Sequence, residues 1–198
     1  MKKYIILICA ALAGAVSCDF LNTVPNDTIA PESYFKTEND LQLFTNPLYN
    51  NLLEKSPFEI QDDHFVQMTP SEWLRGGKFR KGPAEVGGWS WGNLRRINTL
   101  IGNLDKCEDA SVAAQYEAIA RFFRAYFYFD KVVRFGDVPW VDVELSSTDE
   151  RLYAPRDSRE YVMTKMLEDV DFAIETLPAK VSTYRVAKGA ALMLKAQF

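Results

Sequence analysis

One stretch of the sequence, residues 117–145, restricts the possible folds more than any other. Phe and Tyr crowd its first two thirds, and few polar residues separate them. These residues are Phe122, Phe123, Tyr126, Phe127, Tyr128, Phe129 and Phe135. A solvated helix could not expose so much aromatic surface, because burial of apolar surface is the main driving force of folding. The stretch is therefore predicted to begin with a helix that lies in the core.

Polar side chains recur every three or four residues along this helix and so share one side of it. They are Glu117, Arg121, Arg124, Tyr128 and Lys131. This polar stripe is expected to be a solvated face, or a contact with a part of the protein beyond residue 198. For Arg124 and Asp137, an ion pair or a helix cap is expected rather than a ligand contact. The remaining residues form two apolar faces, which require two neighbouring elements.

The predicted core helix has a clear stop signal. It should end near Phe135, because Gly136 can adopt the left-handed conformation of a helix cap and Pro139 cannot continue a helix. Residues 138–145 are then expected to be extended.

Four further helices are predicted from apolar spacing and capping residues. The first spans about 38–53 with Thr37 as its cap, and Pro47 inside it is expected to kink or split it. The residues expected to begin the others are Ser90, Asp157 with Glu160, and Arg185. Between the first two helices, residues 55–88 have no sustained period and are expected to form a long irregular loop.

Short linkers predict that consecutive helices pair as antiparallel hairpins. Ala118, Phe122 and Ala125 also fit part of the tetratricopeptide repeat pattern. The predicted fold class is therefore all-α, with tetratricopeptide-like helical hairpins. No stop signal precedes Phe198, so the chain is expected to be the N-terminal part of a larger fold.

Residues 1–17 have the features of a secretory leader, in which Lys2 and Lys3 precede an apolar run too short to span a membrane. Small residues stand directly before Cys18, as in the cleavage site of a bacterial lipoprotein. Cys18 is therefore predicted to be the acylated N-terminus, followed by one domain over residues 18–198. An ordinary signal peptide with a chance cysteine is the alternative.

The charge of the chain argues against nucleic acid as a partner. Acidic residues number 27 against 23 basic ones, and removal of the predicted leader takes away only basic residues. Neutralising phosphates requires a basic surface, and no run of Lys or Arg supplies one. Cys107 would have no cysteine to pair with, so neither a disulfide framework nor a cysteine metal site is expected.

Several separated groups of residues together form a family pattern. They are Asp-Phe-Leu at 19–21, Pro-Glu-Ser-Tyr-Phe at 31–35, Arg-Ala-Tyr-Phe-Tyr at 124–128, Phe-Gly-Asp-Val-Pro at 135–139, and Pro155, Arg156, Asp169, Ala173, Leu177 and Pro178 before a helix start at Tyr184. This pattern resembles the N-terminal half of the SusD/RagB family of nutrient-binding lipoproteins.

Catalysis has little support in the sequence. His64 is the single histidine, and no serine lies in a G-x-S-x-G setting. Phosphate-binding loops and H-E-x-x-H zinc motifs are absent from the sequence. The adjacent Asp62 and Asp63 do not by themselves provide the separated carboxylates that a glycosidase needs. We expect neither an enzyme nor a cofactor or metal site.

Carbohydrate binding is favoured by the tryptophans in and beside the long loop. Sugars offer a C–H face that packs on aromatic rings, and hydroxyl groups that bind Asp, Asn and Arg. The predicted ligand-binding residues are Asp63, Trp73, Arg75, Arg80, Trp89, Trp91 and Asn93. For each tryptophan the alternative is a side chain that covers the core beneath the loop, and Trp91 fits that alternative best. For Arg75 and Arg80 the alternative is a solvated charge.

The family resemblance implies a function for the whole protein. Such a protein would be anchored to the outer membrane through Cys18 and face the cell exterior. It would capture a glycan there and pass it to a TonB-dependent transporter of the SusC type. Some family members bind peptides, so the ligand class stays open. The alternatives are a helical adaptor that binds a peptide or protein partner, and a lipoprotein that faces the periplasm.

Overall fold

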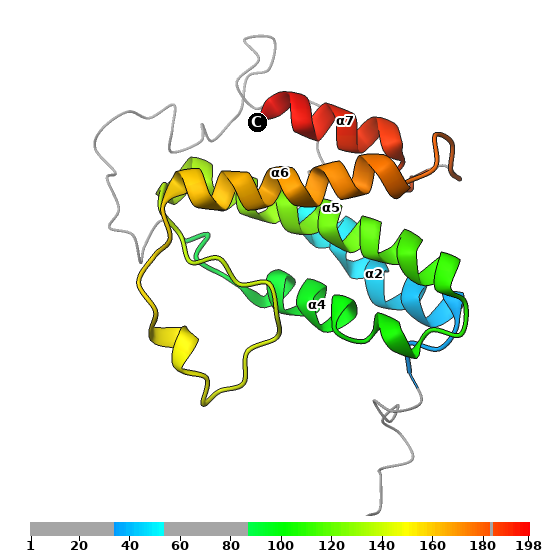
Figure 1. Ribbon diagram of the computed structural model, residues 1–198, viewed down its shortest axis with the longest axis horizontal. Helices are drawn as coiled ribbons and strands as arrows, with labels where there is room; N and C mark the ends of the chain where they lie inside the picture. Colours follow the sequence, from blue (N-terminus) through cyan, green and yellow to red (C-terminus); the bar gives the residue numbers. More distant parts are fainter. Residues whose placement is uncertain (1–33, 54–86, 183) are drawn as a thin grey trace, which may run out of the picture. The chain divides into compact units, whose positions relative to one another are not determined.

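Helix α5 (Ala110–Phe135) is the longest helix among the residues that the computed structural model describes, which are 34–53, 87–182 and 184–198 (Figure 1). The other elements of those residues are α2 (Glu38–Leu52), α4 (Gly92–Ile101), η2 (Leu104–Lys106), η3 (Glu150–Tyr153), α6 (Arg159–Thr176) and α7 (Lys188–Gln197). They belong to one compact unit, Phe35–Phe198. The described residues form no strand, and the predicted all-α class is confirmed. None of their helices is both long enough and apolar enough to cross a membrane.

Helix α5 supplies much of the core. Helices α2, α4 and α6 all pack against it, and α7 packs against α6 (Figure 1). Phe123 and Tyr128 are fully buried. The Phe123 ring meets Tyr49 of α2 edge to face, with the ring centroids 4.8 Å apart. The prediction of a core helix is therefore confirmed, but three helices pack against it where two neighbouring elements were expected.

Both ends of α5 have local causes in the sequence. At the start, Oδ1 of Asp109 accepts hydrogen bonds from the backbone N–H groups of Ser111 (2.8 Å) and Val112 (3.3 Å). At the end, Gly136 has a φ of 73°, which favours glycine. Its N–H donates to the carbonyl of Val132 at 2.9 Å. The helix thus ends where the sequence predicted.

Helix α2 begins as predicted but is not split. The Thr37 hydroxyl accepts from the N–H of Asp40, and the Asp40 carboxylate accepts from the N–H of Thr37, which completes a capping box. Pro47 lies inside the helix, which is nevertheless assigned without a break from Glu38 to Leu52. Of the two outcomes predicted for Pro47, a kink or a split, the split is wrong. The proline removes one backbone donor, while the burial of Leu41 and Leu48 on either side of it holds the helix together.

Two predicted helix starts are displaced by one residue and a third by three residues. Helix α4 begins after Trp91 without a side-chain cap, although Ser90 was expected there. The cap of α6 is Ser158, whose hydroxyl accepts from the N–H of Tyr161 at 3.3 Å. Helix α7 begins at Lys188 and not at Arg185.

The expected capping residue Asp157 binds elsewhere in the fold. Its Oδ2 accepts from the N–H of Trp140 at 2.7 Å. Asp137 caps α6 from a distance, because its Oδ1 accepts from the N–H of Arg159 at 2.8 Å. Helix starts of this kind depend on residues that are remote in the sequence. The expected structural role of Asp137 is confirmed as a cap.

The polar stripe of α5 is mostly buried, so the prediction of a solvated face is wrong. Arg124 is 6% exposed and Lys131 5%. Arg124 makes two hydrogen bonds to Asp169 of α6, from Nε to Oδ2 (2.6 Å) and from Nη2 to Oδ1 (2.7 Å). Arg121 binds Glu117 at 2.6 Å and reaches Asp169 at 3.5 Å. Asp169 thus compensates the charge of Arg124 inside the protein and lies near that of Arg121.

Candidate functional site

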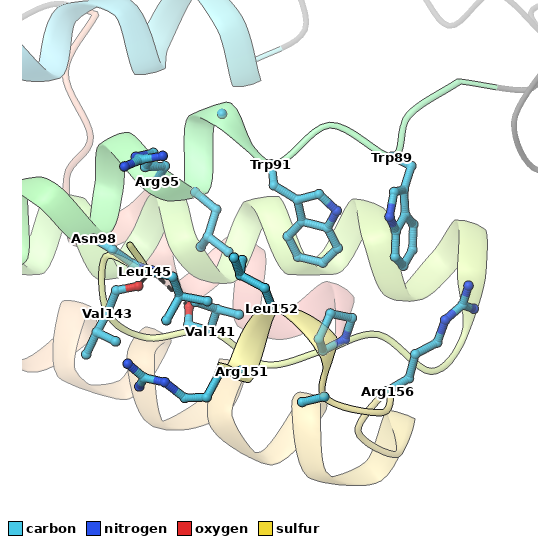
Figure 2. A pocket seen from close by; sticks show the side chains of 14 residues that line it. Trp89, Trp91, Arg95, Asn98, Val141, Val143, Leu145, Arg151, Leu152 and Arg156 are labelled. Carbon is cyan, nitrogen blue, oxygen red and sulfur yellow. Dashed lines mark hydrogen bonds between the residues drawn. The ribbon is translucent and has the colours of Figure 1, made fainter. Parts of the chain in front are cut away.

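An open hollow lies between the start of α4 and the segment that links α5 to α6 (Figure 2). Its volume is about 600 Å³, which is in the range of small-molecule sites. Residues between 89 and 98 form one wall, and residues between 139 and 156 form the other. Most of the lining is apolar, with three arginines among the polar residues.

The chain reaches the first wall through two glycines that no other residue type would readily replace. Gly87 and Gly88 have φ values of 69° and 83°, in the left-handed region. A Cβ atom at Gly88 would also lie 3.2 Å from Nη1 of Arg134. The close approach lets Nζ of Lys131 donate a hydrogen bond to the Gly88 carbonyl. The buried Lys131 thereby fixes the backbone just before Trp89.

The two tryptophans of this wall are held by rings of α5. Trp89 meets Phe135 and Trp91 edge to face, with centroid distances of 4.8 Å and 5.1 Å. Trp91 in turn meets Phe127 at 5.6 Å and Tyr128 at 6.1 Å. Figure 2 shows both indoles directed into the space between the walls. Trp89 remains 40% exposed, so its position is fixed while part of its ring stays accessible.

The second wall, formed by residues between 139 and 156, has no neighbouring strand in the described part of the chain. Side chains of α5 bind its backbone instead. The Tyr128 hydroxyl accepts from the N–H of Val141 (2.7 Å) and donates to the carbonyl of Pro139 (3.1 Å). Burial raises the pKa of this hydroxyl, which therefore stays protonated. Nη1 of Arg124 donates to the carbonyl of Asp142 at 3.3 Å. These bonds satisfy backbone groups that a sheet would otherwise pair.

Asn98 of α4 holds the same wall from the other side. Its Nδ2 donates to the carbonyls of Val141 and Val143, both at 3.0 Å, which fixes the orientation of the amide. Oδ1 is buried and has no hydrogen-bond partner in the described part of the chain. An unpaired buried carbonyl costs roughly 1–3 kcal/mol. The two bonds from Nδ2 offset this cost by ordering the wall.

Two of the three arginines at the hollow are compensated by carboxylates. Arg95 binds Glu144 at 3.1 Å. The Thr99 hydroxyl, 2.6 Å from Glu144, lowers the pKa of that carboxyl, with a smaller contribution from Arg95. Arg151 binds Asp149 at 2.6 Å and lowers the pKa of Asp149 to about 2. Both carboxylates therefore stay ionised at neutral pH and balance these two arginines.

A known protein family matches most of this chain. The SusD-like family, described as starch-binding and associating with the outer membrane, matches residues 34–189. That range includes α2, α4, α5 and α6 and both walls of the hollow. The chain belongs to the SusD-like family. The resemblance to SusD/RagB proteins in the sequence is thereby confirmed.

Individual relatives of this SusD-like chain agree with the assignment. It is 28% identical to SusD-like protein P2 of Formosa agariphila over 205 residues, which cover 90% of the chain and 39% of that relative. A solved SusD-like protein from Bacteroides fragilis matches 88% of the chain and 37% of its own length, with 24% identity and a TM-score of 0.64. A SusD-like carbohydrate-binding protein of the same organism matches 82% of the chain and 37% of its own length, with 19% identity and a TM-score of 0.59. These likenesses show that the fold is SusD-like, and the chain spans about two fifths of these proteins.

The structure places three of the predicted ligand-binding residues of the SusD-like chain. Trp89 and Trp91 line the hollow. Asn93 does not, because its Oδ1 accepts a hydrogen bond from Asn51 of α2 at 3.3 Å. The predicted residues that lie outside the described part of the chain are Asp63, Trp73, Arg75 and Arg80, and the predicted lipidation site Cys18 lies outside it as well.

The second wall of the hollow was not identified from the sequence. Val141, Val143 and Leu145 alternate with acidic residues, which is the pattern of a segment with one buried face. That alternation indicates an extended segment with one apolar face. Its position opposite Trp89 and Trp91 depends on the buried bonds from α4 and α5, which the pattern does not show.

Proposed function

We propose that this SusD-like chain binds a glycan in the hollow between its two tryptophans and the segment 139–145. The observation that carries the proposal is a pair of fixed, accessible indoles on one wall of an open space of about 600 Å³. An aromatic pair of this kind suits the C–H faces of sugar rings, and the apolar second wall suits them equally. The assignment to a starch-binding family supports the same ligand class.

We propose further that the protein is a surface lipoprotein anchored through Cys18. It would face the cell exterior, act without catalysis, and pass its glycan to a SusC-like TonB-dependent transporter. The predicted leader over residues 1–17 and the family's association with the outer membrane support the anchor. The exterior orientation and the transporter rest on the resemblance to SusD/RagB proteins.

Replacing either tryptophan is expected to weaken glycan binding about tenfold or more, equivalent to ~1.4 kcal/mol of binding free energy. The purified chain would be screened against neutral and anionic oligosaccharides, maltoheptaose among them. Titration calorimetry with Trp89→Ala and Trp91→Ala then follows for each oligosaccharide that binds. The matched control is Tyr184→Ala, since Tyr184 is a 93% exposed aromatic residue outside the hollow. Affinity unchanged in both tryptophan variants would reject the hollow as the site.

Cys18→Ala is expected to move the protein from the membrane fraction to the soluble fraction. Acyl chains contribute about 0.8 kcal/mol for each buried CH₂ group, and a chain without them has lost this source of membrane affinity. Fractionation of cells that produce either form measures the change, and Cys107→Ala is the control for losing a cysteine. Full retention of Cys18→Ala in the membrane would contradict the anchor. Digestion by external protease on intact cells would support exposure at the cell exterior.

A further inference from the structure

Arg156 is the arginine at the hollow whose charge remains available. Its guanidinium carbon lies 4.8 Å from the centroid of the Trp89 ring, within the range of a cation–π contact. Figure 2 shows Arg156 on the wall opposite Trp89. Stacking on a ring restrains the guanidinium and leaves the N–H donors in its plane free. In the described part of the chain its one hydrogen bond runs from Nη1 to the carbonyl of Asp137, at 3.5 Å. Most of its donor capacity is therefore unused.

Asp137, whose backbone carbonyl accepts from Arg156, and the adjacent Asp157 each direct one carboxylate oxygen to a backbone N–H group. Asp137 accepts from the N–H of Arg159, and Asp157 accepts from the N–H of Trp140. Among the described residues Arg156 makes no ion pair, unlike the two other arginines of the hollow. The simplest alternative, a solvated surface arginine, does not explain why the side chain is held against Trp89 at the edge of an apolar hollow.

We propose that the glycan taken by the hollow is anionic, and that Arg156 binds a carboxylate or sulfate group on one of its sugar rings. The proposal rests on the proposed function, namely that the hollow binds a glycan. A guanidinium fork pairs with both oxygens of a carboxylate or sulfate, which sets direction as well as charge. The apolar part of the same sugar would then pack against the indole of Trp91. A neutral glycan would offer the guanidinium only hydroxyl oxygens, which accept hydrogen bonds without neutralising its charge.

The test compares saccharides that differ only in charge. Oligogalacturonate is paired with its methyl ester of the same length, and dextran sulfate is paired with dextran. We expect the purified chain to bind at least one charged member more tightly than its neutral partner, and less tightly as salt screens the contact. Arg156→Gln is expected to lower the affinity for that charged member roughly 10- to 100-fold, the range of a hydrogen bond to a charged group. Its affinity for neutral members should fall less than its affinity for that charged member.

Arg159→Gln is the matched control. Arg159 is an exposed arginine three positions further along the chain, and it does not line the hollow. An equal loss of affinity in Arg156→Gln and Arg159→Gln would mean general electrostatic attraction and would overturn the role of Arg156. Equal binding of charged and neutral members would overturn the anionic ligand and leave the glycan-binding function standing. Binding of no saccharide, in this test and in the wider screen, would overturn both proposals.

Discussion

Asp169→Asn is expected to lower the free energy of unfolding by about 3–5 kcal/mol, because it leaves the charge of Arg124 buried without compensation. Asp169 is 2% exposed, and both of its oxygens bind the Arg124 guanidinium, at 2.6 Å and 2.7 Å. The effect should extend to the hollow. Arg124 also donates to the carbonyl of Asp142, so the second wall would lose part of its support.

Urea denaturation of the purified chain measures this change. The control is Glu168→Gln, since Glu168 directly precedes Asp169 and forms an exposed ion pair with Lys165 at 2.8 Å. Its loss should cost at most about 0.5 kcal/mol. A double variant, Arg124→Met with Asp169→Leu, should recover much of the stability, because it buries no unpaired charge. A cost for Asp169→Asn as small as that for Glu168→Gln would contradict the assignment of a buried pair.

Phe123→Ala is expected to lower the free energy of unfolding by about 3–5 kcal/mol through the cavity that it creates. Phe123 is fully buried at the middle of α5. Its ring contacts Tyr49 of α2 at 4.8 Å between centroids and Phe122 of α5 at 5.4 Å. Loss of the ring should therefore weaken the attachment of α2 to α5 as well as the core itself.

Val133→Ala is the matched control on the same helix. Val133 is 67% exposed, so its shortening should change stability by no more than about 0.5 kcal/mol. Urea denaturation of both variants, with hydrogen exchange of the α2 amides, tests the two parts of the prediction. A cost of less than about 1 kcal/mol for Phe123→Ala would show that the ring is not a core residue.

One helix thus carries both the core and the site. Phe123 faces α2, while Arg124 and Tyr128 hold the second wall of the hollow through bonds to backbone groups. Phe127 and Phe135 position the tryptophans of the first wall. Substitutions inside α5 are therefore expected to affect ligand binding without touching the ligand.

The sequence by itself determined the features that depend on neighbouring residues. The aromatic stretch predicted α5, and Gly136 marked its end, because a left-handed cap is a local property of the backbone. Thr37 predicted the start of α2, because an N-cap side chain bonds a backbone group only a few residues away. The motifs at 124–128 and 135–139 indicated the family, which the match over residues 34–189 bears out.

Only the tertiary structure decided which polar residues are buried and where the hollow lies. Spacing placed Arg124 on a polar stripe, but its burial depends on Asp169, which is 45 positions away in the sequence. Asn93 lies between two residues that line the hollow, Gly92 and Leu94, and yet it binds Asn51 of α2. Periodicity reports the direction of a side chain on its own helix. The partner that it meets is set by the packing of helices distant in the sequence, and the same packing brings Trp89 and Arg156 together.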